Sequence, residues 1–270
     1  MDSTAGNVKA LIPAAGRGTR LAGLSGGGSK ELIRLGPRTM IEHCLSMVLD
    51  SGVSEVAVVI SHGKEAVRRA VEGLWAARGP ASGRLEFLYQ HRPLGVAEAM
   101  RLGVRFGGDD PLAVVMPDNL LLGGPPALGR MIAVYRLVRS EVIGVIELDA
   151  AAARLFGNVG LIELEPHAPV VPLRVLSLSP KGAGRLRPRG NGLFYKGFIG
   201  VIYLPGWPER IDGLVPNFQG ELDDTDLVQA LIRESRLWAA PLEGRGFDVG
   251  NPDGLEAARA ALNGAITGEA

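Results

Sequence analysis

Along the first part of the chain, short apolar runs alternate with longer segments in which apolar residues recur at helical spacing. The apolar runs predict buried strands at residues 8–13 (VKALIP), 55–60 (EVAVVI), 84–89 (RLEFLY) and 112–116 (LAVVM). The segments between them predict helices at residues 39–50, 64–77 and 96–106. This alternation favours a mainly parallel sheet whose faces are covered by helices.

From about residue 141 the pattern changes. Apolar runs joined by loops that contain proline or glycine predict strands without long helices between them, at residues 141–148, 159–165, 171–177 and 198–204. These runs favour a mixed or antiparallel region beside the first sheet. The remaining segments predict a helix with an acidic first turn, a last strand and a terminal helix, at residues 224–236, 237–241 and 252–263.

Composition narrows the class of protein. A chain of 270 residues with 46% apolar residues suits a single large α/β domain with a substantial core. Lysine plus arginine equals aspartate plus glutamate, 29 each, so we expect no nucleic acid and no membrane surface as partner. No apolar run approaches the roughly 20 residues of a membrane span. The single cysteine, Cys44, and the lack of a signal-peptide pattern predict a cytoplasmic protein.

A glycine-rich turn, within ALIPAAGRGTRL at residues 10–21, follows the first predicted strand. In open parallel sheets, ligands bind beyond the carboxyl ends of the strands. Arg20 and Lys30 add positive charge to this place. Backbone N–H groups there can approach an anion, because four residues carry little or no side chain: Ala14, Ala15, Gly16 and Gly18. The loop therefore suits a triphosphate, although a turn with solvated cations stays open as an alternative.

Several known site patterns do not fit. Leu21 stands where the dinucleotide fingerprint has its third glycine, which argues against a nicotinamide-dependent oxidoreductase. The phosphate-loop pattern G-x-x-x-x-G-K-[ST] and the G-x-S-x-G elbow of hydrolases are absent. A zinc site is not expected because the histidines share no metal-ligand spacing; they are His43, His62, His91 and His167.

Several motifs in order resemble those of bacterial sugar-1-phosphate nucleotidyltransferases. GRGTRL, the ten-residue step from Arg20 to Lys30, and SKELIRL resemble the family signature, and IPAAGRGTRL is most similar to glucose-1-phosphate uridylyltransferases. Thymidylyltransferases share the same frame. The resemblance covers nearly the whole chain and continues through TMIEHCLSMVLDSGVSEV, YQHRPLGVAEA, VVMPDN, FGNVGLIELE, GELDDTDLVQALI and FDVGNPDGLEAA.

The resemblance implies a fold and a reaction. The expected fold is α/β, a Rossmann-like mixed, mainly parallel sheet flanked by helices, with an embedded smaller β-rich sugar-binding portion. Residues 1–140 would form the nucleotide-binding part, 141–220 the sugar-binding part, and 221–270 the closing helices of a single domain. The implied reaction is attack of a sugar 1-phosphate on the α-phosphorus of UTP or dTTP, with pyrophosphate released. The implied sugar phosphate is glucose 1-phosphate, and the family is often oligomeric.

The resemblance also implies a magnesium site. Asp118 in VVMPDN and Asp248 in FDVG match the two metal aspartates of the family, 130 residues apart in sequence. A carboxylate at the carboxyl end of a strand faces the ligand cleft, and Mg²⁺ takes one or two carboxylates plus phosphate oxygens. Arg20 and Lys30 would hold the departing pyrophosphate. The alternative interpretation is that Asp118 binds no metal and is part of a turn-forming Asp-Asn pair.

Other positions match ligand contacts of the family. Gln90 and Gly95 match the base-reading pair, and a glutamine amide suits the N3–H and a carbonyl of uracil or thymine; Gln90 as an exposed loop residue is the alternative. The nucleotide contacts implied are Ala14, Ala15, Gly16, Gly18, Thr19, Gln90 and Gly95. The sugar-phosphate contacts implied are Gly157, Asn158 and Glu221.

Two cations of the family pattern are missing. Ser179 stands in place of the lysine of a Glu-Lys-Pro motif, and Gln219 stands in place of an arginine. Three interpretations stay open: Lys181, Lys196 or an arginine of residues 185–189 replaces them, the acceptor is an unusual sugar or a cyclitol phosphate, or the chain is a non-catalytic sugar-nucleotide-binding or regulatory relative.

Overall fold

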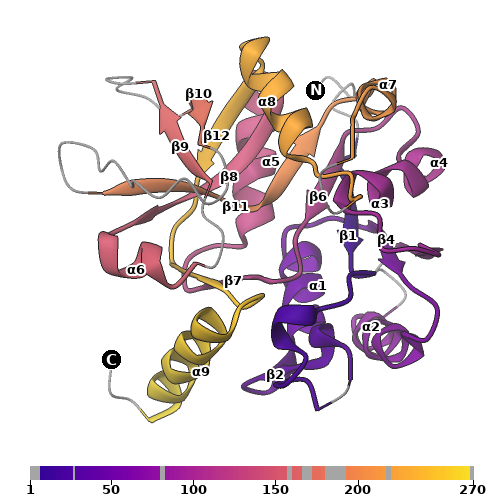
Figure 1. Ribbon diagram of the computed structural model, residues 1–270, viewed down its shortest axis with the longest axis vertical. Helices are drawn as coiled ribbons and strands as arrows, with labels where there is room; N and C mark the ends of the chain where they lie inside the picture. The colour runs from indigo at the N-terminus through magenta and orange to yellow at the C-terminus, as the bar shows by residue number, and fades with distance from the viewer. Residues whose placement is uncertain are drawn as a thin grey trace.

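One nine-stranded sheet runs through the molecule (Figure 1), in the order β5-β4-β1-β6-β11-β8-β12-β10-β9. The computed structural model describes residues 7–26, 28–79, 83–156, 160–165, 172–179, 193–216 and 220–267. The strands of the sheet are β1 Lys9–Pro13, β4 Glu55–Ile60, β5 Arg84–Tyr89, β6 Leu112–Val115, β8 Glu141–Leu148, β9 Leu161–Leu164, β10 Leu173–Leu178, β11 Phe194–Tyr203 and β12 Leu237–Pro241. Two further pairs are β2 Arg34–Leu35 with β3 Arg38–Thr39, and β7 Asn119–Leu122 with β13 Arg245–Asp248.

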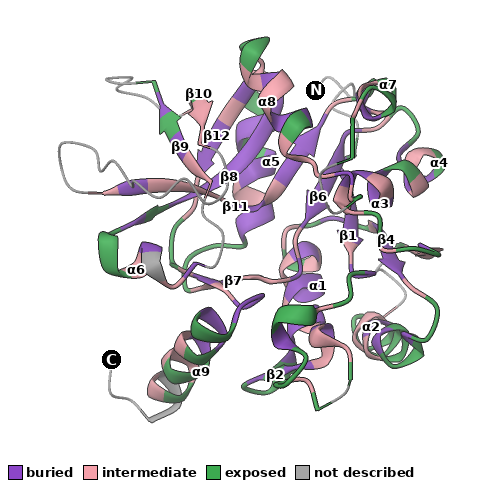
Figure 2. Cartoon of the chain, in the orientation of Figure 1, coloured by how far each residue is buried: buried purple, intermediate pink, exposed green. Residues whose placement is uncertain are grey.

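Helices cover both faces of this sheet. The helices described are α1 Met40–Asp50, α2 Glu65–Ala77, α3 Val96–Leu102, α4 Val104–Gly107, α5 Ala127–Val138, α6 Ala150–Arg154, α7 Trp207–Asp212, α8 Thr225–Arg233 and α9 Pro252–Thr267, with short 3-10 turns η1 Thr19–Leu21 and η2 Lys30–Leu32. Side chains of α1, α2 and α5 join one hydrophobic cluster, and those of α3, α4, α7 and α8 join another. Alternate residues of β1 divide between the two clusters, Ala10 and Ile12 in one and Leu11 in the other. Figure 2 shows the central strands as largely buried.

The first half of the sheet is parallel. Strand β1 pairs in parallel with β4 and with β6, and β4 pairs in parallel with β5. The carboxyl ends of these strands therefore meet at one edge of the sheet. The loops after β1 and β6, and the start of α2 after β4, all lie at this edge.

The second half continues the same sheet with mostly antiparallel pairs. Strand β11 is antiparallel to both β6 and β8, and β12 lies between β8 and β10. The predicted antiparallel region is thus an extension of the parallel half. Strand β11 begins at Phe194, earlier than the sequence pattern predicted at residue 198.

A third hydrophobic cluster joins the two distant ends of the chain. Leu21 and Met40 pack with Leu120 of β7, Phe247 of β13 and Leu255 of α9. The β7–β13 pair places Asp248 directly opposite Asn119. This small pair of strands therefore brings the end of the chain to the carboxyl edge of β6.

Several element boundaries differ from the sequence prediction. The helix predicted at residues 96–106 is divided at Gly103, where a side chain would overlap Leu11 of β1. Helix α8 ends at Arg233, before the predicted end at residue 236, whereas α9 extends to Thr267, beyond the predicted end at residue 263. The sequence pattern did not predict α5 or α7. Among the residues described, the search for a helix with the length and apolar character of a membrane span found none.

Candidate active site

An ion pair joins the first loop to the end of β6. Lys30, in η2, places its ammonium 2.8 Å from Oδ2 of Asp118. The charge of Asp118 is the main reason that the pKa of Lys30 is raised above 10.5. Burial favours a higher pKa for the Asp118 carboxyl, but the charges of Lys30 and Arg20 and the Lys30 hydrogen bond outweigh it, so that pKa is below 3.8. Both groups are therefore charged at neutral pH.

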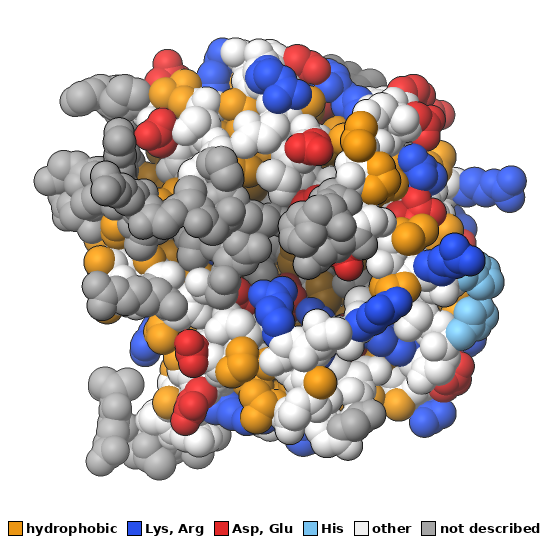
Figure 3. All heavy atoms as spheres, in the orientation of Figure 1, with side chains coloured by type: hydrophobic (Ala, Val, Ile, Leu, Met, Phe, Trp, Pro, Cys, Tyr) orange, Lys and Arg blue, Asp and Glu red, His pale blue; other side chains and the backbone are white. Residues whose placement is uncertain are grey.

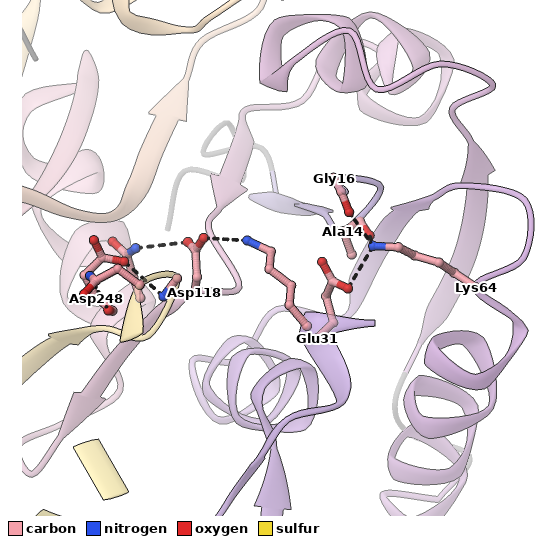
Figure 4. A network of polar contacts seen from close by, with 10 residues as sticks. Ala14, Gly16, Glu31, Lys64, Asp118 and Asp248 are labelled. Carbon is pink, nitrogen blue, oxygen red and sulfur yellow. Dashed lines mark hydrogen bonds and ion pairs between the residues drawn. The ribbon is translucent and has the colours of Figure 1, made fainter. Parts of the chain in front are cut away.

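The two aspartates converge over Gly250. A Cβ atom built on Gly250 would lie 2.7 Å from Asp118 Oδ2 and 3.1 Å from Asp248 Oδ1, so these two oxygens are separated by at most about 5.8 Å, the sum of the distances. Figure 4 shows both carboxylates in one network of polar contacts. A residue with a side chain at position 250 would occupy the space that the two carboxylates share.

Backbone and amide hydrogen bonds fix this acidic pair. The N–H of Val249 donates to the carbonyl of Asp118 at 2.9 Å, and the N–H of Gly250 donates to Asp248 Oδ1 at 3.1 Å. Asn119 donates from Nδ2 to Asp118 Oδ1 at 3.3 Å, while its Oδ1 accepts from the N–H of Ile199 at 2.9 Å. Asn119 thus ties the acidic pair to a bulge of β11, where its pairing with β8 shifts register between Gly197 and Val201.

A second ion pair, between Lys64 and Glu31, holds the glycine-rich loop from the side of α2. Lys64, the residue before α2, donates to the carbonyls of Ala14 and Gly16 and to Glu31 Oε2, at 2.7, 2.8 and 2.8 Å. Glu31 follows Lys30 in η2 and is fully buried. Figure 4 shows Lys64 reaching the loop from the start of α2.

Thr19 and Arg20 begin the short η1 turn and are exposed. The charge of Arg20 contributes to the low pKa of Asp118 and opposes the raised pKa of Lys30. Arg20 is therefore close enough to act on both groups electrostatically. In Figure 3, cationic and acidic side chains lie together around a hollow near the middle of the face shown.

Gln90 and Gly95 contact each other at the carboxyl end of β5. Gln90 is buried, 4% exposed, and its Nε2 donates to the carbonyl of Gly95 at 3.2 Å. Its Oε1 accepts no hydrogen bond from the residues described. Gly95 has φ 100° and leaves no room for a side chain beside the Leu222 carbonyl, so packing alone requires glycine there. This burial excludes the alternative in which Gln90 is an exposed loop residue.

The residues expected at the sugar phosphate are only partly described. Lys196 lies in β11, with its Nζ 3.2 Å from the carbonyl of Gly197 and 5.6 Å from the centre of the Phe156 ring. Glu221 precedes Leu222, whose backbone bonds Leu94 and Ala97 beside Gly95. Ser179 ends the β9–β10 pairing, where its Oγ accepts from the N–H of Leu161 at 2.9 Å. Gly157, Asn158, Lys181, residues 185–189 and Gln219 lie outside the described residues.

The acidic pair fits a magnesium ion better than zinc. Within the described parts of the chain, no group of three or more histidine, cysteine or acidic residues is placed to hold a metal by itself. Mg²⁺ suits a site with one or two protein carboxylates, because water and substrate phosphates supply its other ligands. Asp118 and Asp248, which approach each other at Gly250, supply these two carboxylates.

Sequence reasoning missed three residues of the site. The sequence analysis names Lys64 only as the start of a helix, and it gives Glu31 and Asn119 no role in the site beyond the motifs that contain them. A glutamate next to Lys30 within SKELIRL was the available signal, because an isolated acidic residue in a buried turn requires a partner. Nothing in the sequence indicated that Lys64 would be that partner.

Comparison with known proteins identifies similar sequences and folds. A family model described as nucleotidyl transferase matches residues 9–171. The chain is 24% identical over 261 residues to the UTP–glucose-1-phosphate uridylyltransferase YngB of Bacillus subtilis, covering 90% of this chain and 85% of that protein. It is 27% identical over 258 residues to a glucose-1-phosphate thymidylyltransferase of Streptomyces antibioticus, covering 94% of this chain and 66% of that protein.

Solved structures share the fold. A structure of apo UDP-glucose pyrophosphorylase has a TM-score of 0.78 at 19% identity, covering 97% of this chain and 99% of that chain. A UTP-bound UGPase from Acinetobacter baumannii has a TM-score of 0.74 at 21% identity, covering 96% of this chain and 94% of that chain. These matches confirm the predicted mixed α/β fold.

Proposed function

The chain belongs to the nucleotidyl transferase family, and from this premise we propose that it transfers a nucleotidyl group from UTP or dTTP to a sugar 1-phosphate, such as glucose 1-phosphate, and releases pyrophosphate. The names of the uridylyltransferase and thymidylyltransferase relatives support this substrate class. The observation that carries the proposal is the convergence of Asp118 and Asp248 over Gly250, beside Lys30. A cytoplasmic location is part of the proposal.

The reaction requires alignment and charge neutralisation more than proton transfer. The phosphate oxygen of the sugar 1-phosphate is already ionised at neutral pH, so it attacks the α-phosphorus without a general base. The transition state carries negative charge on the phosphoryl oxygens, and cations placed around it lower its free energy. The candidate site supplies such cations from the first loop, Arg20 and Lys30.

Lys30 has an exchangeable partner. Its ammonium, 2.8 Å from Asp118, can transfer its hydrogen bonds to an oxygen of an incoming phosphate. Asp118 and Asp248 would hold Mg²⁺, which when bound neutralises phosphate charge and orients the reacting oxygens. Lys30 and Arg20 stabilise the charge that develops on the departing pyrophosphate.

The side-chain amide of Gln90 suits a uracil or thymine base. Its Nε2 is committed in part to Gly95, whereas Oε1 accepts no bond from the described residues. That oxygen can accept the N3–H of uracil or thymine, and the second Nε2 hydrogen can reach a base carbonyl. Cytosine has no N3–H, so the pairing disfavours it. We include Ala15, Gly18 and Thr19 among the nucleotide contacts because they lie on the same loop as Gly16.

The sugar phosphate would bind beside the second half of the sheet. We assign residues 1–140 to nucleotide binding, 141–220 to sugar binding and 221–270 to closing the site. Cationic replacements for the missing family residues would come from Lys181, Lys196 or residues 185–189. Gly157, Asn158 and Glu221 complete the proposed sugar contacts.

A substrate panel tests the proposal. UTP, dTTP, ATP, CTP and GTP are each combined with glucose 1-phosphate and several other sugar or cyclitol phosphates, with MgCl₂, and pyrophosphate release is measured. We expect turnover with UTP or dTTP and one sugar 1-phosphate. Nucleotide binding without pyrophosphate from any pair would instead favour the non-catalytic relative that Ser179 suggests, since it stands in place of a phosphate-binding lysine.

A further inference from the structure

Lys64 uses all of its hydrogen-bonding capacity inside the protein. Its ammonium has three N–H donors, and they reach the Ala14 carbonyl, the Gly16 carbonyl and Glu31 Oε2, at 2.7, 2.8 and 2.8 Å. Lys64 itself is only 9% exposed. This side chain therefore lies behind the glycine-rich loop and connects β1, the loop, η2 and the start of α2.

These bonds determine where the loop's N–H groups point. In a trans peptide the carbonyl and the following N–H point in opposite directions. The carbonyls of Ala14 and Gly16 are turned towards Lys64, so the N–H groups of Ala15 and Arg17 are turned away from it. Among the described residues, neither N–H donates to a protein atom. Two uncommitted donors that both point away from Lys64 suit a polyanion.

Glu31 keeps a buried cation at this position. Burial lowers the pKa of Lys64, and the charge and hydrogen bond of Glu31 oppose that shift. Glu31 Oε1 is buried without a partner in the described structure, so Lys64 is the main compensation for this carboxylate. Because Glu31 follows Lys30, the same pair also anchors the turn from which Lys30 reaches Asp118.

We propose that Lys64 is a positioning residue that aims the backbone N–H groups of Ala15 and Arg17 at the phosphates of the nucleoside triphosphate, with Glu31 holding it in place. The inference rests on the proposed function for the identity of the ligand. Lys64 touches no substrate; it acts through the two carbonyls that it binds.

The test uses binding of UTP and of inorganic tripolyphosphate, measured by calorimetry with MgCl₂. Lys64→Met removes the three hydrogen bonds but also leaves Glu31 buried and unpaired, which endangers folding. The double variant Lys64→Met with Glu31→Leu replaces the buried pair with apolar side chains of similar size, which are usually tolerated. Thermal unfolding of each variant shows which of them retain the native fold.

Lys9→Met is the matched control. Lys9 is also 9% exposed and lies at the opposite end of β1. Its ammonium likewise donates to two carbonyls, those of Phe106 and Gly107, and pairs with Asp110 at 3.0 Å. The control variant loses a similar buried network that lies away from the glycine-rich loop.

We expect the double variant to bind UTP and tripolyphosphate at least about tenfold more weakly, the effect of losing oriented charge-dependent hydrogen bonds, while the KM for the sugar 1-phosphate stays within about twofold. Lys9→Met should bind both probes as the wild type does. A folded double variant with wild-type affinity for both probes would overturn the inference, as would equal weakening in Lys9→Met.

The outcome separates this inference from the proposed function. A wild type that binds UTP but releases no pyrophosphate overturns the catalytic proposal, and the role of Lys64 is still decided by the dissociation constants. A wild type that turns over, combined with unaffected binding in the double variant, overturns the role of Lys64 alone. A wild type that binds neither probe overturns both.

Discussion

Lys30 and Asp118 form an ion pair, and the proposed reaction gives each of them a second partner. Lys30 would bind a phosphate, and Asp118 would bind a metal ion. The 2.8 Å contact compensates each charge at a position where side chains are largely shielded, with 16% and 22% of the two side chains exposed. A carboxylate kept ionised in this way is ready to bind a cation. The protein therefore holds its catalytic groups charged before a ligand arrives.

The pKa shifts predict when this pair contributes to stability. The pKa of Asp118 is lowered from 3.8, so its contribution is complete above pH 3.8 and is lost as the pH falls through the folded-state value. The pKa of Lys30 is raised from 10.5, so its contribution is complete below pH 10.5 and is lost as the pH rises through the folded-state value. Across the neutral range the contribution is constant.

We expect Lys30→Met to lower the free energy of unfolding by about 1–3 kcal/mol at neutral pH, less than for a fully buried pair because both side chains are partly exposed. The difference from the wild type should be equal at about pH 6 and pH 9 and should shrink in acid. Urea unfolding at several pH values measures it. A difference that grows as the pH falls would contradict the assigned direction for Asp118.

Gly250 sets the space above the two carboxylates. Gly250→Ala would place a methyl group 2.7 Å from Asp118 Oδ2, so that carboxylate would have to move. We expect turnover to fall about tenfold or more and to require more MgCl₂, because displacing a carboxylate that binds the metal lowers the affinity of the site for the metal. Pyrophosphate release measured against MgCl₂ concentration tests this.

Gly73→Ala is the control for that substitution. Gly73 lies in α2, and a Cβ atom there meets nothing within 4 Å. Alanine should leave turnover unchanged and raise stability by about 0.5–1 kcal/mol, the usual gain within a helix. Equal activity losses in the two variants would mean that the space at residue 250 has no special role.

At the scale of elements, the bulge in β11 connects the acidic pair to the second half of the sheet. Ile199 has φ 67°, and the pairing of β11 with β8 shifts register between Gly197 and Val201. A β-branched residue in this conformation costs about 1–2 kcal/mol. The bulge persists because the N–H of Met116 donates to the Ile199 carbonyl and Asn119 accepts from the Ile199 N–H, at 2.7 and 2.9 Å.

Removal of the Asn119 side chain should therefore affect both stability and catalysis. We expect Asn119→Ala to lower the free energy of unfolding by about 1–3 kcal/mol, because the N–H of buried Ile199 loses its acceptor. Turnover should fall as well, since Asp118 loses a hydrogen-bond donor. Urea unfolding and pyrophosphate release provide the two measurements.

Ser177→Ala serves as the comparison. Its hydroxyl bonds Glu163 at 2.8 Å on the exposed surface of β10, away from the bulge. Such surface changes usually stay within about 0.5 kcal/mol. If Asn119→Ala were no more destabilising than Ser177→Ala, the bulge would not depend on Asn119.

The sequence predicted elements best where the signal is local. The parallel strands β1, β4, β5 and β6 were predicted because each is a short run rich in apolar residues, and β1, β4 and β6 are buried on both faces. By contrast, the start of β11 was missed because residues 194–197 pair with distant strands, and their own pattern is weak. The close approach of Gly103 to Leu11, where the predicted helix is divided, is likewise a contact that no local pattern contains.

At the scale of the whole molecule, topology brings distant residues into one site. Strand β6 ends just before Asp118, and β13 ends at Asp248. The β7–β13 pairing brings these two aspartates together although 130 positions separate them in the sequence. Their proximity could be expected from the family resemblance but not from spacing. The buried pair of Glu31 and Lys64 could not be expected even so, because it depends on how α2 begins relative to the first loop.

The central claim is that Asp118 and Asp248 act as one unit on one divalent ion. The direct measurement is kcat/KM for pyrophosphate release in the wild type, Asp118→Asn, Asp248→Asn and the double variant, with exposed Asp226→Asn on α8 as control. Each single change should lower kcat/KM by about 10²–10³. The kcat/KM of the double variant should lie within about threefold of the value for the less active single variant. Near-normal activity in either single variant, or losses that multiply in the double variant, would contradict the shared site.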